Sequence, residues 1–155
     1  MTNQCPDTGK SMTGAATSLE GAPVITRTDM QSTMKLSATK LELDSMVTTA
    51  QDMLYVKDTV ESMDLEVETP MSLWSDNKGV VDIANGWTTG GRTRHMALKC
   101  HFLRELVESG LIQVRFQKGT NMQADLFTKN LARPDFKKLA KYFVGKEASG
   151  KAKTG

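Results

Sequence analysis

The chain is poor in cysteine and in aromatic residues, and its apolar runs are short. Its two cysteines, Cys5 and Cys100, lie far apart without a CxxC spacing, which argues for reduced thiols and against a disulfide framework or a zinc knuckle. No apolar run is long enough to cross a membrane, and residues 1–11 lack the basic flank and apolar core of a secretory signal. We therefore expect an intracellular protein with no membrane partner.

The composition of the chain is typical of one ordinary soluble domain. The 155 residues are 39% hydrophobic and 25% charged, so the chain can bury a core of its own. We find no internal repeat and no second domain. The predicted domain covers residues 1–144, and residues 145–155, GKEASGKAKTG, are predicted to form a disordered basic tail.

Charge is distributed unevenly along the chain. Residues 1–91 carry 6 Lys or Arg against 13 Asp or Glu, a balance of −7, whereas residues 92–155 carry 14 against 5, a balance of +9. A basic half suits a phosphate-binding surface, because each neutralised phosphate releases condensed counterions. A solvated, Lys-rich surface is an equally good explanation of the charge alone.

The first part of the chain predicts a hairpin and a long helix. A weak strand from Met12 to Ser18, a turn at residues 19–21 and a returning strand from Ala22 to Thr26 form the hairpin. Apolar residues at steps of three and four then predict a helix from Ser37 to about Met63. Thr39 and Glu42 have the spacing of a capping box, although Ser37 can equally be the cap.

The second part alternates strands and helices. The expected elements are a strand at residues 71–75, a short helix over residues 80–84, a helix from His95 to Glu108, a strand at residues 111–117, a short helical segment around residue 125 and a last helix that opens at Pro134. Gly110 suits the position that ends the second long helix. The pattern predicts a single α/β domain.

Three carboxylates stand out by their position. Glu42 lies near the start of the first long helix, Asp76 where a strand passes into a helix, and Asp125 after the last strand. Each also has an ordinary explanation: Glu42 as the capping partner of Thr39, Asp76 as a helix N-cap, and Asp125 as a surface acid. Their spacing alone does not define an active site.

Between Thr93 and Leu139 the chain holds T-R-H, H-F-L-R-E-L-V and A-D-L-F-T-K in that order. These motifs resemble the C-terminal ribonuclease H domain of copia-type LTR retrotransposon polyproteins. Thr93 to Leu139 contains the family's K/R-H, H-F-x-R-E-L-V and A-D-x-F-T-K elements in order. Upstream, LWSDNKGVVDIA is similar to its strand-ending C-D-N-x-x-A block, and the stretch from Leu19 to Met46 is similar to the block with S-S-T-E-A-E-Y. The resemblance covers nearly the whole chain.

The resemblance implies a ribonuclease H-like mixed sheet flanked by helices. It also implies metal-dependent endonucleolytic hydrolysis of RNA in RNA–DNA hybrids during reverse transcription. Glu42, Asp76 and Asp125 would be catalytic and would hold two Mg²⁺ or Mn²⁺ ions, which prefer hard oxygen ligands.

The implied partners are an RNA–DNA hybrid and the reverse transcriptase portion of the same polyprotein, in a cytoplasmic particle or the nucleus. The residues expected to contact nucleic acid are Asn77, Arg92, Arg94, His95, Lys99 and Lys129. His95 and His101 are six residues apart, a spacing that does not favour joint metal ligation on one helix face.

The chain departs from the family at two points that bear on catalysis. The family's first, central strand and its first metal-binding Asp align immediately before Met1, so we expect the central strand to be missing. Lys40 replaces the first Glu of the E-A-E triplet, and its positive charge near Glu42 lowers affinity for a cation. The alternative function is therefore a catalytically dead relic or a recruited nucleic-acid-binding module.

Overall fold

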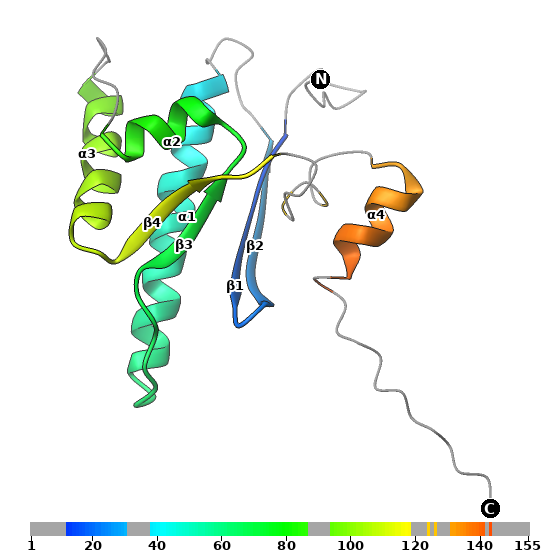
Figure 1. Cartoon of the computed structure of the whole chain (residues 1–155), viewed down its shortest axis with the longest axis horizontal. Helices are drawn as coiled ribbons and strands as arrows, with labels where there is room; N and C mark the ends of the chain where they lie inside the picture. The colour runs from blue at the N-terminus through cyan, green and yellow to red at the C-terminus, as the bar shows by residue number, and fades with distance from the viewer. Residues whose placement is uncertain are drawn as a thin grey trace, which may run out of the picture.

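The structure, a computed structural model, describes residues 12–30, 38–86, 94–118, 124, 126, 131–141 and 143 (Figure 1). Its elements are β1 (Met12–Leu19), β2 (Ala22–Met30), α1 (Ala38–Glu61), β3 (Met71–Ser75), α2 (Lys78–Ala84), α3 (Arg94–Glu108), β4 (Ile112–Phe116) and α4 (Arg133–Ala140). The α/β class is confirmed. The predicted tail, residues 145–155, lies outside the described residues.

The predicted hairpin is confirmed, and it is longer than expected. β1 and β2 pair antiparallel from Leu19 and Ala22 at the turn to Met12 and Met30 at the open end. The turn uses positive φ angles at Glu20 and Gly21, of 49° and 82°, and glycine adopts that conformation without steric cost. The ladder shifts register at Thr17 and Ser18, which marks a β-bulge close to the turn.

α1 confirms the helix predicted from the apolar periodicity, and it packs against both β1 and β3. Leu43, Met46, Ala50 and Met53 recur at steps of three and four residues and are all buried. In Figure 1 the helix runs behind β3 and β4, with the hairpin beside it. One helix therefore backs strands from both halves of the chain.

β3 and β4 form a parallel pair joined through α2 and α3. Met71 pairs with Ile112 at one end and Ser75 with Phe116 at the other. Parallel neighbours need a long crossover connection, which these two helices supply. Gly110, at φ 73°, follows the end of α3 as predicted, and its N–H donates to the carbonyl of Val107 at 3.1 Å.

The core lies between α1 and the β3–α2–α3–β4 unit. Its members are buried apolar side chains from all five elements: Leu43, Met46, Ala50, Met53, Leu73, Val80, Val81, Ile83, Ala84, Cys100, Leu103, Leu106, Ile112 and Val114. Leu98, an apolar residue of α3, is 66% exposed. α3 turns Cys100, Leu103 and Leu106 inward, and Leu98 falls outside that stripe.

Two ion pairs tie other elements to α1. The guanidinium of Arg27 on β2 donates two hydrogen bonds to Asp52, at 2.6 and 2.7 Å. The hydrogen bond to Asp52, and then its charge, raise the pKa of Arg27 above its ordinary value. The ammonium of Lys99 on α3 donates to Asp44 at 2.5 Å. The hairpin and α3 are thereby both linked to the long helix.

The described strands form two separate two-stranded sheets, β1 with β2 and β3 with β4. The single mixed sheet that the resemblance implies is therefore not formed by these four strands, because no hydrogen-bonded ladder joins β1 to β3. Within the described part of the chain, no helix is long and apolar enough to span a membrane.

Candidate functional site

A cavity of about 660 Å³ lies between the hairpin and β3. Its walls are β1 with its turn on one side and all of β3 on the other, and α1 contributes the residues beneath. Residues 66–68, which precede β3, close off part of it, and Gln117 and Ala124 also line it. The cavity is therefore lined by residues from distant parts of the sequence. They include Glu42 and the residues that precede Asp76 and Asp125 in the sequence.

Glu42 lines this cavity from the first turns of α1 and is half-buried. Its ordinary explanation, a capping box with Thr39, does not agree with the helix boundary, because α1 begins at Ala38 and Thr39 lies within the first turn. With Ser37 as the cap, the reciprocal position would be Lys40 rather than Glu42. Capping therefore does not account for Glu42.

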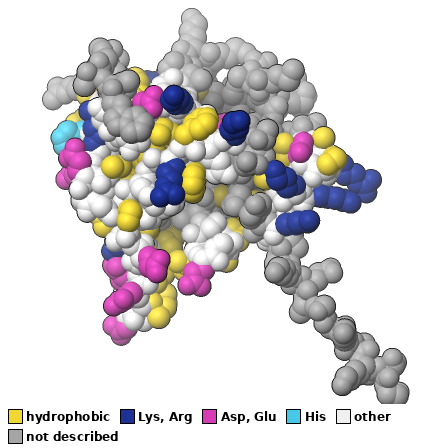
Figure 2. Space-filling view, in the orientation of Figure 1, with side chains coloured by type: hydrophobic (Ala, Val, Ile, Leu, Met, Phe, Trp, Pro, Cys, Tyr) yellow, Lys and Arg dark blue, Asp and Glu magenta, His cyan; other side chains and the backbone are white. Residues whose placement is uncertain are grey.

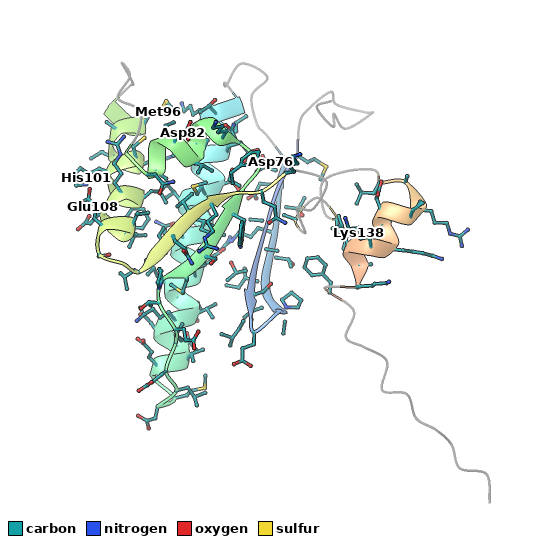
Figure 3. The ribbon with its side chains drawn as sticks, in the orientation of Figure 1. Asp76, Asp82, Met96, His101, Glu108 and Lys138 are labelled. Atoms are coloured by element: carbon teal, nitrogen blue, oxygen red, sulfur yellow. The ribbon has the colours of Figure 1, made fainter. Side chains whose placement is uncertain are left out.

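Asp76 follows β3 directly, where the chain turns into α2, and its side chain is exposed (Figure 3). The N-cap of α2 is Asn77 and not Asp76: the side-chain oxygen of Asn77 accepts from the N–H of Val80 at 3.3 Å. The N–H of Asn77 in turn donates to the hydroxyl of Ser75 at 3.1 Å. Asn77, expected to contact nucleic acid, thus has a structural role, and Asp76 is left without a capping function.

Asp125 lies outside the described residues, so its predicted place in the site is not tested. Ala124, the residue before it, lines the same cavity as Glu42 and Ser75. Among the residues whose placement is described, no group of three His, Cys, Asp or Glu side chains is close enough to hold a metal ion. Glu42 and Asp76 are the two predicted ligands that the structure describes.

The predicted nucleic-acid contacts are described only in part. Arg92 and Lys129 lie outside the described residues, and Arg94 and His95 open α3 with side chains that are not described. Lys99 is half-exposed and paired with Asp44. His101 is exposed and lies on the outer side of α3, away from Asp76 (Figure 3).

An exposed aromatic and cationic pair was not predicted from the sequence. The guanidinium of Arg115 on β4 lies 5.6 Å from the ring centroid of Trp74 on β3, and it donates to the side-chain oxygen of Gln113 at 2.7 Å. Trp74 is 43% exposed. Its neighbours Leu73 and Ser75 are buried, and since side chains alternate along a strand, Trp74 must face the other way. The alternation of side chains along β3 could therefore have indicated from the sequence that Trp74 is exposed.

A second cationic feature is the exposed face of α4. Arg133, Lys137, Lys138 and Lys141 are all exposed, against one exposed acid, Asp135. Figure 2 shows these basic side chains projecting from the helix. Pro134 lies in the first turn, as predicted, and Leu139 is the buried residue of the helix. Part of the positive charge of the second half of the chain therefore lies on the exposed surface of α4.

Comparison with known proteins finds distant similarity to transposon polyproteins. It is 25% identical over 139 residues to the retrovirus-related Pol polyprotein from transposon TNT 1-94 of Nicotiana tabacum, covering 90% of this chain and 10% of that protein. It is 27% and 26% identical, over 104 and 105 residues, to those from transposons RE1 and RE2 of Arabidopsis thaliana, covering 67% and 68% of this chain and 7% of each relative.

No family model matches the chain, and no solved structure matches it. The chain spans a tenth or less of the length of the curated relatives it matches. Its α/β fold and these distant relatives together support an α/β domain derived from a retrotransposon polyprotein.

Proposed function

We propose that this chain is the ribonuclease H-type domain of its polyprotein and hydrolyses the RNA strand of RNA–DNA hybrids with the help of divalent cations. The observation that carries the proposal is the shared cavity. Glu42 lines it, as do Ser75, which precedes Asp76 in the sequence, and Ala124, which precedes Asp125. This shared lining by three segments far apart in the sequence supports the proposal.

The described donors have the chemistry that a magnesium or manganese site requires. Glu42 and Asp76 offer hard carboxylate oxygens, and the N-cap of α2 is Asn77 rather than Asp76. When bound, two such ions would activate the attacking water and stabilise the leaving oxygen. The carboxylates of Glu42 and Asp76 would hold the cations. Lys40, two residues before Glu42, opposes cation binding by its charge.

The basic second half supplies the features needed to hold a hybrid. The exposed cations of α4 can neutralise phosphates without reading sequence. The guanidinium of Arg115, held by Gln113 beside Trp74, adds an oriented donor on the outer face of β4. Selection of RNA over DNA would rest on the 2′-hydroxyl and on the A-like shape of the duplex.

The test is cleavage of a labelled RNA–DNA hybrid with Mg²⁺ or Mn²⁺, compared with an all-DNA duplex. Glu42→Gln and Asp76→Asn should each lower the cleavage rate by about 100-fold or more, because each removes a charged metal ligand. Asp58→Asn is the matched control, since Asp58 is an exposed acid in the last turn of α1. Equal rates for all three variants would refute the assignment of the site.

A second candidate function is hybrid binding without cleavage, which the exposed cations on α4 favour. In that case the chain binds the hybrid with a steep salt dependence, and neither Mg²⁺ nor Mn²⁺ produces cleavage. Replacing Lys137 and Lys138 by Ala should then reduce the slope of log affinity against log salt by about 2. Metal-dependent cleavage that Asp76→Asn abolishes would exclude this candidate.

A further inference from the structure

The C-terminal end of α1 presents apolar side chains to solvent. Tyr55 is 69% exposed, and Met63 and Leu65 are each 58% exposed. Tyr55, Thr59 and Met63 follow one another at steps of four residues, so they lie along one side of the helix and of the turn that ends it. Single exposed apolar residues are ordinary, whereas three at one end of a helix form a candidate contact surface.

The same end of the helix is acidic. Residues 61–68 contain no Lys or Arg, and their exposed acids are Glu61, Asp64, Glu66 and Glu68. The nearest cation before them in the sequence, Lys57, is paired with Glu61 at 2.6 Å. Figure 2 shows acidic and hydrophobic side chains next to one another at this lower end of the molecule. We call residues 61–68 together with Tyr55 the acidic end.

Backbone hydrogen bonds hold the acidic end in one shape. The N–H of Asp64 donates to the carbonyl of Glu61 at 3.1 Å, and the N–H of Leu65 donates to the carbonyl of Val60 at 3.4 Å. This pair of bonds is the Schellman arrangement that closes a helix, with Asp64 at a positive φ of 59°. A partner therefore meets a preformed surface, which lowers the entropic cost of binding.

The charge of the acidic end restricts the class of its partner. The phosphates of nucleic acid are repelled by it, since both carry negative charge. Among the described side chains, no group of three His, Cys, Asp or Glu residues is close enough to hold a metal ion, so a cation site is not formed there either. A partner that fits must present cations together with an apolar group that covers Met63 and Leu65.

α4 carries these complementary features. Arg133, Lys137 and Lys141 are exposed and recur at steps of four residues, so they lie along one side of the helix. Phe136 is 50% exposed and lies one turn after Arg133, which places an apolar ring beside the cations. Figure 1 shows α4 well apart from the lower end of α1, with the hairpin between them. In this arrangement α4 can meet the acidic end of a second copy and not its own.

We propose that α4 of one copy docks on the acidic end of a second copy. Phe136 packs against Met63 and Leu65, and the cations of α4 face Glu66 and Glu68. The contact joins two different surfaces, so each docked pair keeps one unoccupied α4 and one unoccupied acidic end. Further copies can therefore add head to tail, into a ring where the rotation closes and into an open chain where it does not. A hybrid held by the same cations would compete with this docking.

The size of α4 sets the strength of the contact. Its eight residues are about 12 Å long, so the buried area falls at the low end of specific interfaces, where complexes are weak and transient. Exposed charges are screened beyond about 10 Å at 0.1 M salt and beyond about 3 Å at 1 M. We therefore expect a dissociation constant of about 0.1–1 mM at low salt and no association at high salt.

Sedimentation equilibrium of the full chain, run at concentrations up to about 2 mM, measures this association directly. At low salt the average mass should rise with concentration and pass that of a dimer, because the contact does not close on two copies. At about 1 M salt the mass should stay at that of the monomer. A chain that remains monomeric at low salt over the whole concentration range overturns the proposal.

Charge-reversing variants test each surface separately. Glu66→Lys with Glu68→Lys alters the acidic end, and Lys137→Glu with Lys141→Glu alters α4. Each double variant alone should associate about tenfold more weakly or less. An equimolar mixture of the two should associate again, because the unmodified α4 of one variant meets the unmodified acidic end of the other. Absence of this recovery on mixing contradicts the pairing of the two surfaces.

The matched control for charge is Glu105→Lys with Glu108→Lys, which makes the same charge change at exposed residues of α3. It should associate as the unmodified chain does. Far-ultraviolet circular dichroism establishes that all three double variants fold. Equal weakening by the α3 variant would show that net charge, and not the acidic end, governs association, and the proposal would then be wrong.

Variants that keep the charge test the apolar part of the contact. Met63→Gln and Phe136→Gln should each weaken association about threefold or more, because each removes an exposed apolar side chain that docking would bury. Leu98→Gln is the matched control, since Leu98 is 66% exposed on α3, away from both surfaces. Equal association for these three variants rules out the proposed packing of Phe136.

Cross-linking with a carbodiimide, which joins a Lys amine to a carboxylate in contact with it, locates the interface. In a mixture of isotope-labelled and unlabelled copies, mass spectrometry distinguishes links between copies from links within one. Links between copies should join Lys137 or Lys141 to Glu66 or Glu68. Links between copies that involve neither surface overturn the proposal, and so does association that neither salt nor charge reversal weakens.

Discussion

Leu43 offers a direct test of how the core supports the candidate site. Its side chain is fully buried in α1, next to Glu42, within the main apolar cluster. Leu43→Ala removes buried apolar atoms and leaves a cavity, which costs about 3 kcal/mol of unfolding free energy in a well-packed core. For a chain of this size that loss corresponds to a decrease in Tm of roughly 6–12 °C.

Urea denaturation followed by circular dichroism measures this difference through the midpoint and slope. Leu98→Ala is the matched control, since Leu98 is also a helical leucine but is 66% exposed, and its loss should cost less than about 0.5 kcal/mol. Similar costs for both variants would refute the assignment of the core. So would a Leu43→Ala variant as stable as the unmodified chain.

The remaining predictions concern polar contacts. Asp52→Asn weakens the ion pair that holds β2 on α1, so amide exchange should speed up in the hairpin and not in β3, as hydrogen-exchange mass spectrometry would detect. Asn77→Ala removes the N-cap of α2 and should lower the unfolding free energy by about 1 kcal/mol in urea denaturation. Lys99→Ala should reduce the salt slope of hybrid binding by about 1, whereas Asp44→Ala, which releases Lys99, should not.

The sequence predicted most elements because local patterns define them. The apolar periodicity of α1 and the positive φ required near Gly21 are both visible in short windows. The extent of β2 was not predictable in this way: Thr26 was expected to end it, yet it continues to Met30. Arg27, Thr28 and Asp29 are polar and exposed. They are held in the strand by pairing with β1, a partner that no local pattern reveals.

The candidate site was predictable in its residues and only partly in its geometry. The strand-to-helix junction at Asp76 follows from the sequence, but the choice between Asp76 and Asn77 as N-cap depends on backbone angles at the junction. The exposure of Trp74 follows from alternation along β3, provided that Leu73 is recognised as the inward residue. The cavity itself depends on how α1 holds two sheets apart, which is a long-range property.

α1 has a consequence for how the chain tolerates change. Its 24 residues contact β1, β3, α2 and α3, so both sheets take their alignment from one helical surface. Inserting a single residue midway would turn the following half of the helix by about 100° relative to the preceding half. Side chains in one half of the helix would then rotate away from the elements that they now contact. Insertions and deletions within α1 should therefore destabilise the fold far more than substitutions do.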